Sequence, residues 1–351
     1  MSELTTWCDG LPSVFASEPG GGGPAFGRRR QSWLTRIWRF SRWFVLTGIV
    51  LAVALTAASF GFDFSTNWPV PRPHGLLMAS GGGFDTRYRE WGTAGTPIVL
   101  VPGAFETADT FAALGPVLGA DHRVFAIDLS GTGYSAPSPS YSTAQLAGQL
   151  LAFLHDKGLT GANAPLLVGH SSGAAVVGLA AVTGGTGAVR GVVFLDGDAT
   201  SLSGPGPLGW LLVNPFRTSL LRLALSQDWL IKRLYTAQCG PLCPPLNAAG
   251  VETWRLPLQQ PEFSAAVTYT LRYGIPSLTT AQFTALRALP VRKLVVYGAK
   301  DPQMSALDES ATANRIGAPP PVTVPGWHLT MISSPKQVAA SLGAVSAGSG
   351  N

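Results

Sequence analysis

The chain has 351 residues, a formal net charge of +5 at pH 7 and an apolar content of 46%. This composition excludes a disordered chain and is typical of a globular protein with a large core, built as one domain with an insertion or as two domains. Six of the basic residues precede residue 43, namely Arg28, Arg29, Arg30, Arg36, Arg39 and Arg42. The remainder is close to neutral, which excludes a basic surface for nucleic acid.

The N-terminal region predicts a membrane anchor. Residues 1–42 are expected to form a disordered, basic cytoplasmic tail. Residues 43–62 carry no charge, and the run is long enough to cross a bilayer as a helix. We expect a single-pass signal-anchor helix that leaves the arginines in the cytoplasm and places everything after residue 62 outside it. Residues 63–75 are expected to be an extended, proline-rich spacer.

Two alternatives for residues 43–62 stay open. Ala57 and Ala58 could serve as the small residues of a cleavage site, so that the run would be a signal peptide and the protein would be secreted. A buried core helix is the second alternative, although core helices rarely stay apolar on every face for this length.

The rest of the chain alternates short apolar runs with helical patterns. The expected strands are Ile98–Val101, Val124–Ile127, Leu166–Val168, Val192–Leu195, Leu294–Tyr297 and a short run near Val322. Continuously apolar strands separated by helices predict a mostly parallel α/β sheet covered on both faces. Residues 76–200 and 291–346 form this predicted core, and residues 201–290 interrupt it as a mostly helical cap.

The most informative motif is Gly-His-Ser-Ser-Gly, residues 169–173. It follows an apolar strand and precedes a helical run of small residues, which is the context that a G-x-S-x-G turn requires. Glycines at 169 and 173 avoid collisions in so tight a turn. The turn presents the Ser171 hydroxyl as a nucleophile, and the backbone NH of Ser172 can stabilise an oxyanion at the helix N-terminus.

Elimination selects His328 as the base that activates the serine. The chain has four other histidines, and none is well placed: His74 lies in the spacer, His122 before a strand, His155 late in a helix and His170 beside Ser171 itself. His328 follows the last predicted strand, where the functional sites of parallel sheets gather. Asp301, after another strand, is the expected carboxylate partner of the histidine, with Asp198 as the alternative acid and Asp196 beside it.

Two further features follow from the pattern. The loop after Val101 should supply a second oxyanion donor, the NH of Ala104 or, next, that of Phe105. In an exported domain, Cys239 and Cys243 around a Gly-Pro turn predict a local disulfide. No metal-ligand cluster is present in the sequence pattern, and neither a metal nor a cofactor is expected.

Four motifs resemble those of the α/β-hydrolase fold family: VPGAFET, DLSGTGYS, GHSSG, and GAKD followed by GWHL. The match runs from about residue 85 to residue 340 and departs from the usual pattern at Pro102, where relatives carry histidine. The resemblance implies the α/β-hydrolase fold with an inserted cap and the triad order Ser171, Asp301, His328. A serine at the turn indicates acyl chemistry and disfavours dehalogenases and epoxide hydrolases, in which relatives carry aspartate.

We therefore expect a serine hydrolase that cleaves an ester-like bond through an acyl-enzyme. A small, apolar substrate would enter past cap residues that could equally be cap core, namely Trp210, Leu211, Leu212, Trp229 and Trp254. Exopeptidase-like, lactonase and perhydrolase activities are alternatives on the same fold. A non-catalytic, membrane-tethered binding protein is the alternative from another class. The sequence determines neither the particular substrate nor the oligomeric state.

Overall fold

The computed structural model describes residues 28–67, 70, 72–200 and 216–346, and divides the chain into two compact units, Met1–Ala57 and Ala58–Asn351. The predictions for residues 1–27 and for Trp210, Leu211 and Leu212 lie outside the described residues.

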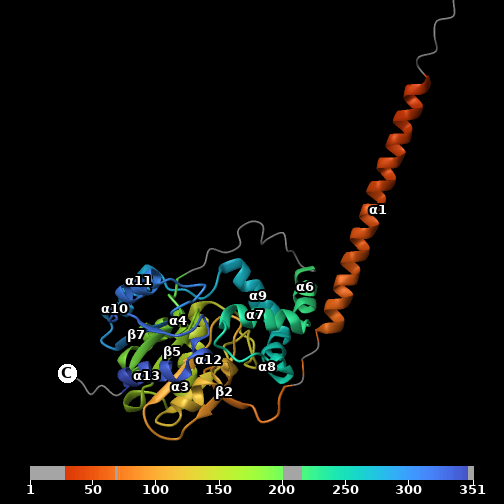
Figure 1. Cartoon of the computed structure of the whole chain (residues 1–351). Coiled ribbons are helices and arrows are strands. Elements are labelled where there is room, and N and C mark those ends of the chain that lie inside the picture. Colours follow the sequence, from red (N-terminus) through yellow and green to blue (C-terminus); the bar gives the residue numbers. More distant parts are fainter. Residues whose placement is uncertain (1–27, 68–69, 71, 201–215, 347–351) are drawn as a thin grey trace, which may run out of the picture. The chain divides into compact units, whose positions relative to one another are not determined.

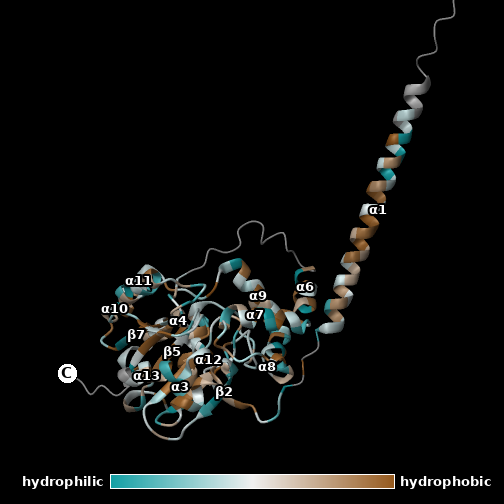
Figure 2. Cartoon of the chain, viewed as in Figure 1, coloured by the Kyte–Doolittle hydropathy of each residue, from teal (hydrophilic) through white to brown (hydrophobic). Residues whose placement is uncertain are grey.

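A single long helix, α1 (Arg28–Thr66), contains the apolar run. The part from Thr35 to Thr66 is long and apolar enough to cross a membrane, a property that a signal sequence near the N-terminus shares. Apolar residues dominate the middle of α1 in Figure 2. The helix is longer than the predicted span at both ends, because residues 28–42, expected as tail, and residues 63–66, expected as spacer, are helical.

The second unit is built on an eight-stranded sheet with the order β1-β2-β4-β3-β5-β6-β7-β8. Figure 1 labels β2, β5 and β7 of this sheet among the surrounding helices. The strands are β1 (Leu77–Gly81), β2 (Phe84–Trp91), β3 (Pro97–Val101), β4 (Arg123–Ile127), β5 (Leu166–His170), β6 (Gly191–Leu195), β7 (Arg292–Gly298) and β8 (Val322–Val324). Strands β1 and β2 are antiparallel additions, and the pairings from β4 to β8 are parallel. The predicted fold class is therefore confirmed, and the carboxyl ends of the six parallel strands share one edge.

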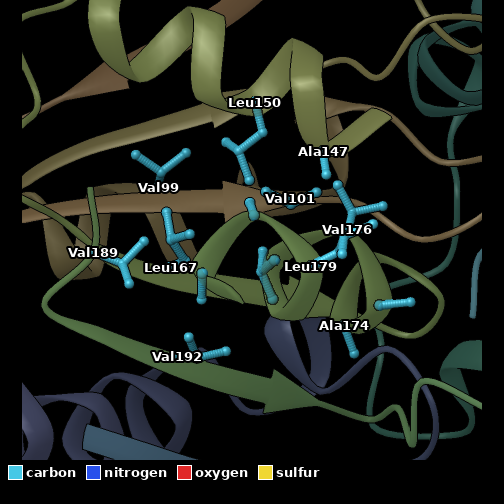
Figure 3. Close-up of a cluster of buried hydrophobic side chains, with 14 of the residues drawn as sticks. Val99, Val101, Ala147, Leu150, Leu167, Ala174, Val176, Leu179, Val189 and Val192 are labelled. Atoms are coloured by element: carbon cyan, nitrogen blue, oxygen red, sulfur yellow. The ribbon is translucent and has the colours of Figure 1, made fainter. Parts of the chain in front are cut away.

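Helices cover both faces of this sheet. Helices α3 (Thr143–Asp156), α4 (Gly173–Gly184), α10 (Thr280–Ala288) and α11 (Ala306–Ile316) contribute to one buried cluster, and α2 (Leu114–Leu118), α12 (Thr330–Ser333) and α13 (Pro335–Ser346) to the other. Figure 3 shows Val99, Leu167 and Val192 of three strands facing α3 and α4 in the first cluster. Short 3-10 turns lie at Ala108–Phe111, Gly161–Asn163 and Gly185–Gly187. Coverage on both faces explains why these strands are continuously apolar.

The cap consists of α6 (Phe216–Leu225), α7 (Asp228–Cys239), α8 (Ala248–Leu258) and α9 (Pro261–Tyr273), which lie between β6 and β7 in the chain. It has a small core of its own, made by Leu225, Ile231, Val251 and Phe263. Helix α10 falls within the range predicted for the cap, but it packs against α4 and α11 and buries Leu286 in the sheet's core. The cap therefore ends earlier than residue 290.

Candidate active site

The turn between β5 and α4 holds Ser171 in a left-handed conformation, with φ of 50°. Such a conformation is strained for a residue other than glycine and persists only where its surroundings enforce it. A Cβ at Gly169 would lie 2.4 Å from the carbonyl oxygen of Gly173, and one at Gly173 would lie 2.5 Å from that of Pro102. The two glycines are therefore required for the close packing of strand, turn and helix.

His328 and Asp301 form a buried pair at the same edge of the sheet. His328 Nδ1 and Asp301 Oδ2 are 2.8 Å apart, and both side chains are almost inaccessible to solvent. The other carboxylate oxygen of Asp301 accepts a hydrogen bond from the backbone NH of Gln303 (2.7 Å). Both oxygens of Asp301 are thereby held, so the carboxylate orients the imidazole of His328.

Ser171 and His328 line one cavity of about 210 Å³ together with Ser172 and Asp198. The carboxylate of Asp198 accepts hydrogen bonds from the NH and hydroxyl of Thr200. The structure thus pairs His328 with Asp301 and places the alternative acid in the cavity wall with a different partner.

Asp196, the second carboxylate after β6, is fully buried and has a structural role. It accepts hydrogen bonds from the NH of Gly298 (2.7 Å) and from the hydroxyl of Thr330. Burial raises the pKa of Asp196 to about 7. These bonds join the ends of β6 and β7 to the segment that follows His328.

The loop after β3 passes directly over Ser171. A Cβ at Gly103 would lie 2.9 Å from the Cβ of Ser171, and Phe105 has a positive φ of 66°. Ala104 and Ser172, whose backbone NH groups are the predicted oxyanion donors, line one further cavity. The structure therefore brings these two residues to the same side of the turn.

A buried pair that the sequence analysis did not identify connects three segments of the site. His170 Nδ1 lies 2.7 Å from Glu106 Oε2, and His170 Nε2 lies 2.9 Å from the carbonyl oxygen of His328. Glu106 Oε2 also accepts the NH of Gly103 (3.0 Å). The pair therefore links the loop over Ser171, the end of β5 and the loop that carries His328.

Electrostatics favour the ionised form of this pair. Burial alone would lower the pKa of His170, but the charge and hydrogen bond of Glu106 outweigh it and raise that pKa to about 9. Burial likewise opposes ionisation of Glu106, yet the charge and hydrogen bond of His170 lower the pKa of the Glu106 carboxyl. With His170 protonated, both of its ring nitrogens donate, one to Glu106 and the other to the His328 carbonyl.

This arrangement predicts a stability that decreases with rising pH. A histidine whose pKa is higher in the folded state stabilises it below the unfolded value of about 6.5 and loses that contribution as pH rises through about 9. Glu106→Gln should lower the Tm at pH 6 and flatten the fall in Tm between pH 6.5 and 9. Thermal unfolding of both proteins across this range measures the effect, with the exposed carboxylate variant Asp121→Asn as control. Equal slopes for wild type and Glu106→Gln would contradict the assignment.

A second, apolar cavity of about 220 Å³ lies between the loop over Ser171 and the cap. Its walls are Ala104, Phe105, Glu106, Ile231, Leu234, Tyr235, Gln238, Trp254, Leu258 and Leu329. Trp254 lines this cavity and also packs against the core of the cap. Trp229, expected beside it, is 62% exposed on the surface of the cap and lines none of these cavities.

The sheet order, the strained serine turn at the carboxyl ends of the strands and the inserted helical cap together define an α/β hydrolase. A family model described as the alpha/beta hydrolase family matches residues 98–341, and the chain belongs to this family.

Comparisons with individual proteins agree with this class. The chain is 31% identical over 147 residues to N-formylmaleamate deformylase of Pseudomonas putida KT2440, a match covering 41% of this chain and 52% of that protein. The chain thus spans about half the length of this curated relative. The solved structure of a membrane phospholipase A has a TM-score of 0.61 at 16% identity. The match covers 90% of this chain and 97% of the phospholipase chain. The solved structure of an N-formylmaleamic acid deformylase from Pseudomonas putida S16 has a TM-score of 0.58 at 17% identity. The match covers 76% of this chain and 98% of the deformylase chain.

Proposed function

We propose that the protein is a serine hydrolase that cleaves ester bonds through an acyl-enzyme. The observation that carries the proposal is the convergence of Ser171 and the His328–Asp301 pair on one cavity. In this reaction His328 accepts the proton of Ser171 as Oγ attacks the carbonyl carbon. The NH groups of Ala104 and Ser172 stabilise the oxyanion that forms.

The second half of the reaction uses the same groups. His328 donates its proton to the leaving alkoxide oxygen, and the carbonyl re-forms as the acyl-enzyme. Water then attacks this ester while His328 accepts its proton, and Ser171 is released with the free acid as product. Asp301 stabilises the imidazolium that forms on His328.

The apolar cavity at Phe105 and Trp254 supports a substrate with an apolar group next to the reacting carbonyl. Hydrolysis of an N-acyl bond is the second candidate, because the relative that is 31% identical over 147 residues is a deformylase that acts on N-formylmaleamate. The two candidates share the acyl-enzyme and differ in the leaving group.

Two measurements test the proposal. A fluorophosphonate probe should label the wild-type protein covalently at Ser171, which a binding protein without a reactive serine would not permit. A panel of chromogenic esters of increasing acyl length, set beside matched amides, should show faster turnover of the esters. Absence of both labelling and turnover would overturn the proposal, and faster turnover of the amides would favour the second candidate.

We further propose that α1 anchors the protein, with residues 28–42 in the cytoplasm and the second unit outside it. The basic residues before an uncharged helix and the disulfide between Cys239 and Cys243 support this orientation. The full-length protein should then resist carbonate extraction from membranes, and external protease should digest the second unit in cells without an outer layer. Digestion from the cytoplasmic side would contradict the orientation, and a mature N-terminus near residue 59 would indicate secretion.

A further inference from the structure

The last two turns of α1 belong to the second unit and are bonded to the cap. The hydroxyls of Ser59 and Ser219 are 2.6 Å apart. Arg222 donates from Nη1 to the carbonyl oxygen of Asp63 (2.6 Å) and from Nη2 to Oδ1 of Asn67 (2.6 Å). Helix α6 is therefore held where the apolar run of the chain ends.

A cavity of about 400 Å³ lies at this junction and has no part in the triad. Its walls include Phe62 of α1, Arg222 and Leu223 of α6, Leu258 of α8, and Phe263 and Ser264 of α9. The volume is within the range of small-molecule sites, about 300–1,000 Å³, and the walls are mostly apolar.

Two apolar contacts connect this outer cavity with the one beside the loop over Ser171. Leu258 lines both cavities. Phe263 lines the outer cavity and packs edge-to-face, with ring centres 5.4 Å apart, against Phe105, which lines the inner one. A hydrocarbon chain that ran from the outer cavity to the inner one would pass Leu258 and the Phe263–Phe105 contact and so approach the loop over Ser171.

The outer surface of the cap next to this cavity has the character of a membrane-interface helix. Phe216, Leu220 and Leu223 recur at the spacing of one helical face on α6, and all three are exposed. Trp229 on α7 is also exposed, and the exposed Lys232 and Arg233 follow it. Exposed apolar side chains beside basic ones favour contact with an anionic lipid surface.

We propose that the outer cavity admits the acyl chain of an amphiphilic ester drawn from the bilayer and directs it toward Ser171. The proposal rests on the proposed serine hydrolase activity and on α1 as the proposed anchor, because an anchored enzyme meets its substrate at the lipid surface. The substrate class is accordingly a membrane-borne ester with a long acyl chain. A short, water-soluble ester needs only the cavity at Ser171 and does not use the outer one.

The test uses the full-length protein in vesicles of phosphatidylcholine and phosphatidylglycerol. The two substrates are 4-methylumbelliferyl oleate dissolved in the vesicles and 4-methylumbelliferyl acetate in the water phase. Ser264→Trp places an indole in the outer cavity, and Ala265→Trp places one on the exposed face of the same helix as a matched control. Ser264→Trp should lower kcat/KM for the oleate roughly tenfold or more, because excluding a couple of chain methylenes suffices for that factor. The acetate rate should stay within about twofold for both variants, since transition-state contacts near Ser171 are unchanged.

Each outcome has a definite meaning. An equal loss for both substrates, or no loss for the oleate, overturns the acyl-chain site and leaves the serine hydrolase proposal standing. A wild-type protein that a fluorophosphonate does not label and that hydrolyses neither ester overturns both. Labelling and the Tm establish that each variant is folded. If Ser264→Trp does not fold, Ser264→Leu replaces it and should give a smaller loss confined to the oleate.

Discussion

Ser171→Ala is expected to lower kcat for ester hydrolysis by about 10⁶-fold, because it removes the hydroxyl that is assigned to form the acyl-enzyme. The fold should remain intact, since alanine tolerates the φ of 50° no worse than serine does and both are small. The measurement is the steady-state rate on the best ester of the panel, together with the loss of fluorophosphonate labelling.

The adjacent serine provides a matched control. Ser172→Ala keeps the backbone NH that is assigned to the oxyanion and removes only a buried hydroxyl. It should retain labelling and most of its activity. If Ser171→Ala remains active and Ser172→Ala does not, the assignment of the nucleophile is wrong.

The second large effect on kcat is expected when Asp301, the carboxylate partner of His328, is replaced. Asp301→Asn should reduce kcat by roughly 10⁴-fold, because the amide would favour the wrong tautomer of His328 while preserving the shape of the side chain. Steady-state kinetics at pH 8 on the same ester measures the loss, and the Tm shows whether the fold persists.

Asp198→Asn is the control for this prediction. The carboxylate of Asp198 is bonded to Thr200 and not to His328, so its loss should change kcat far less. The reverse ranking of the two variants would transfer the role of the acid from the end of β7 to the end of β6.

The parts of the fold that depend on local pattern could be predicted from the sequence. Apolar strands and the glycines around Ser171 specify the sheet and the turn, because steric rules act on neighbouring residues. The choice between Asp301 and Asp198 could not be made in the same way. Both follow buried strands at one sheet edge, and only the three-dimensional course of the two loops decides which carboxylate meets His328.

Other features depend on contacts between distant segments. Nothing in the pattern pairs Glu106 with His170, which are 64 positions apart, although a carboxylate three residues after Gly103 and a histidine next to the serine were both visible. The sequence pattern does not predict the extension of α1 to Thr66, because proline-rich composition follows the uncharged run closely. The pattern also does not separate helix α10 from the cap, because an amphipathic helix does not reveal which surface it covers.

The boundary between the two units lies inside α1, one residue before the hydrogen bonds to α6 begin at Ser59. The two units meet between Ala57 and Ala58, and both residues are small enough for an export peptidase. A cut there would leave Ser59, Asp63 and Arg222 with all their partners and would release the hydrolase whole. Cleavage at this boundary would then change the substrate range of the enzyme. The released enzyme would still hydrolyse water-soluble esters, but it would no longer reach esters that stay in the membrane.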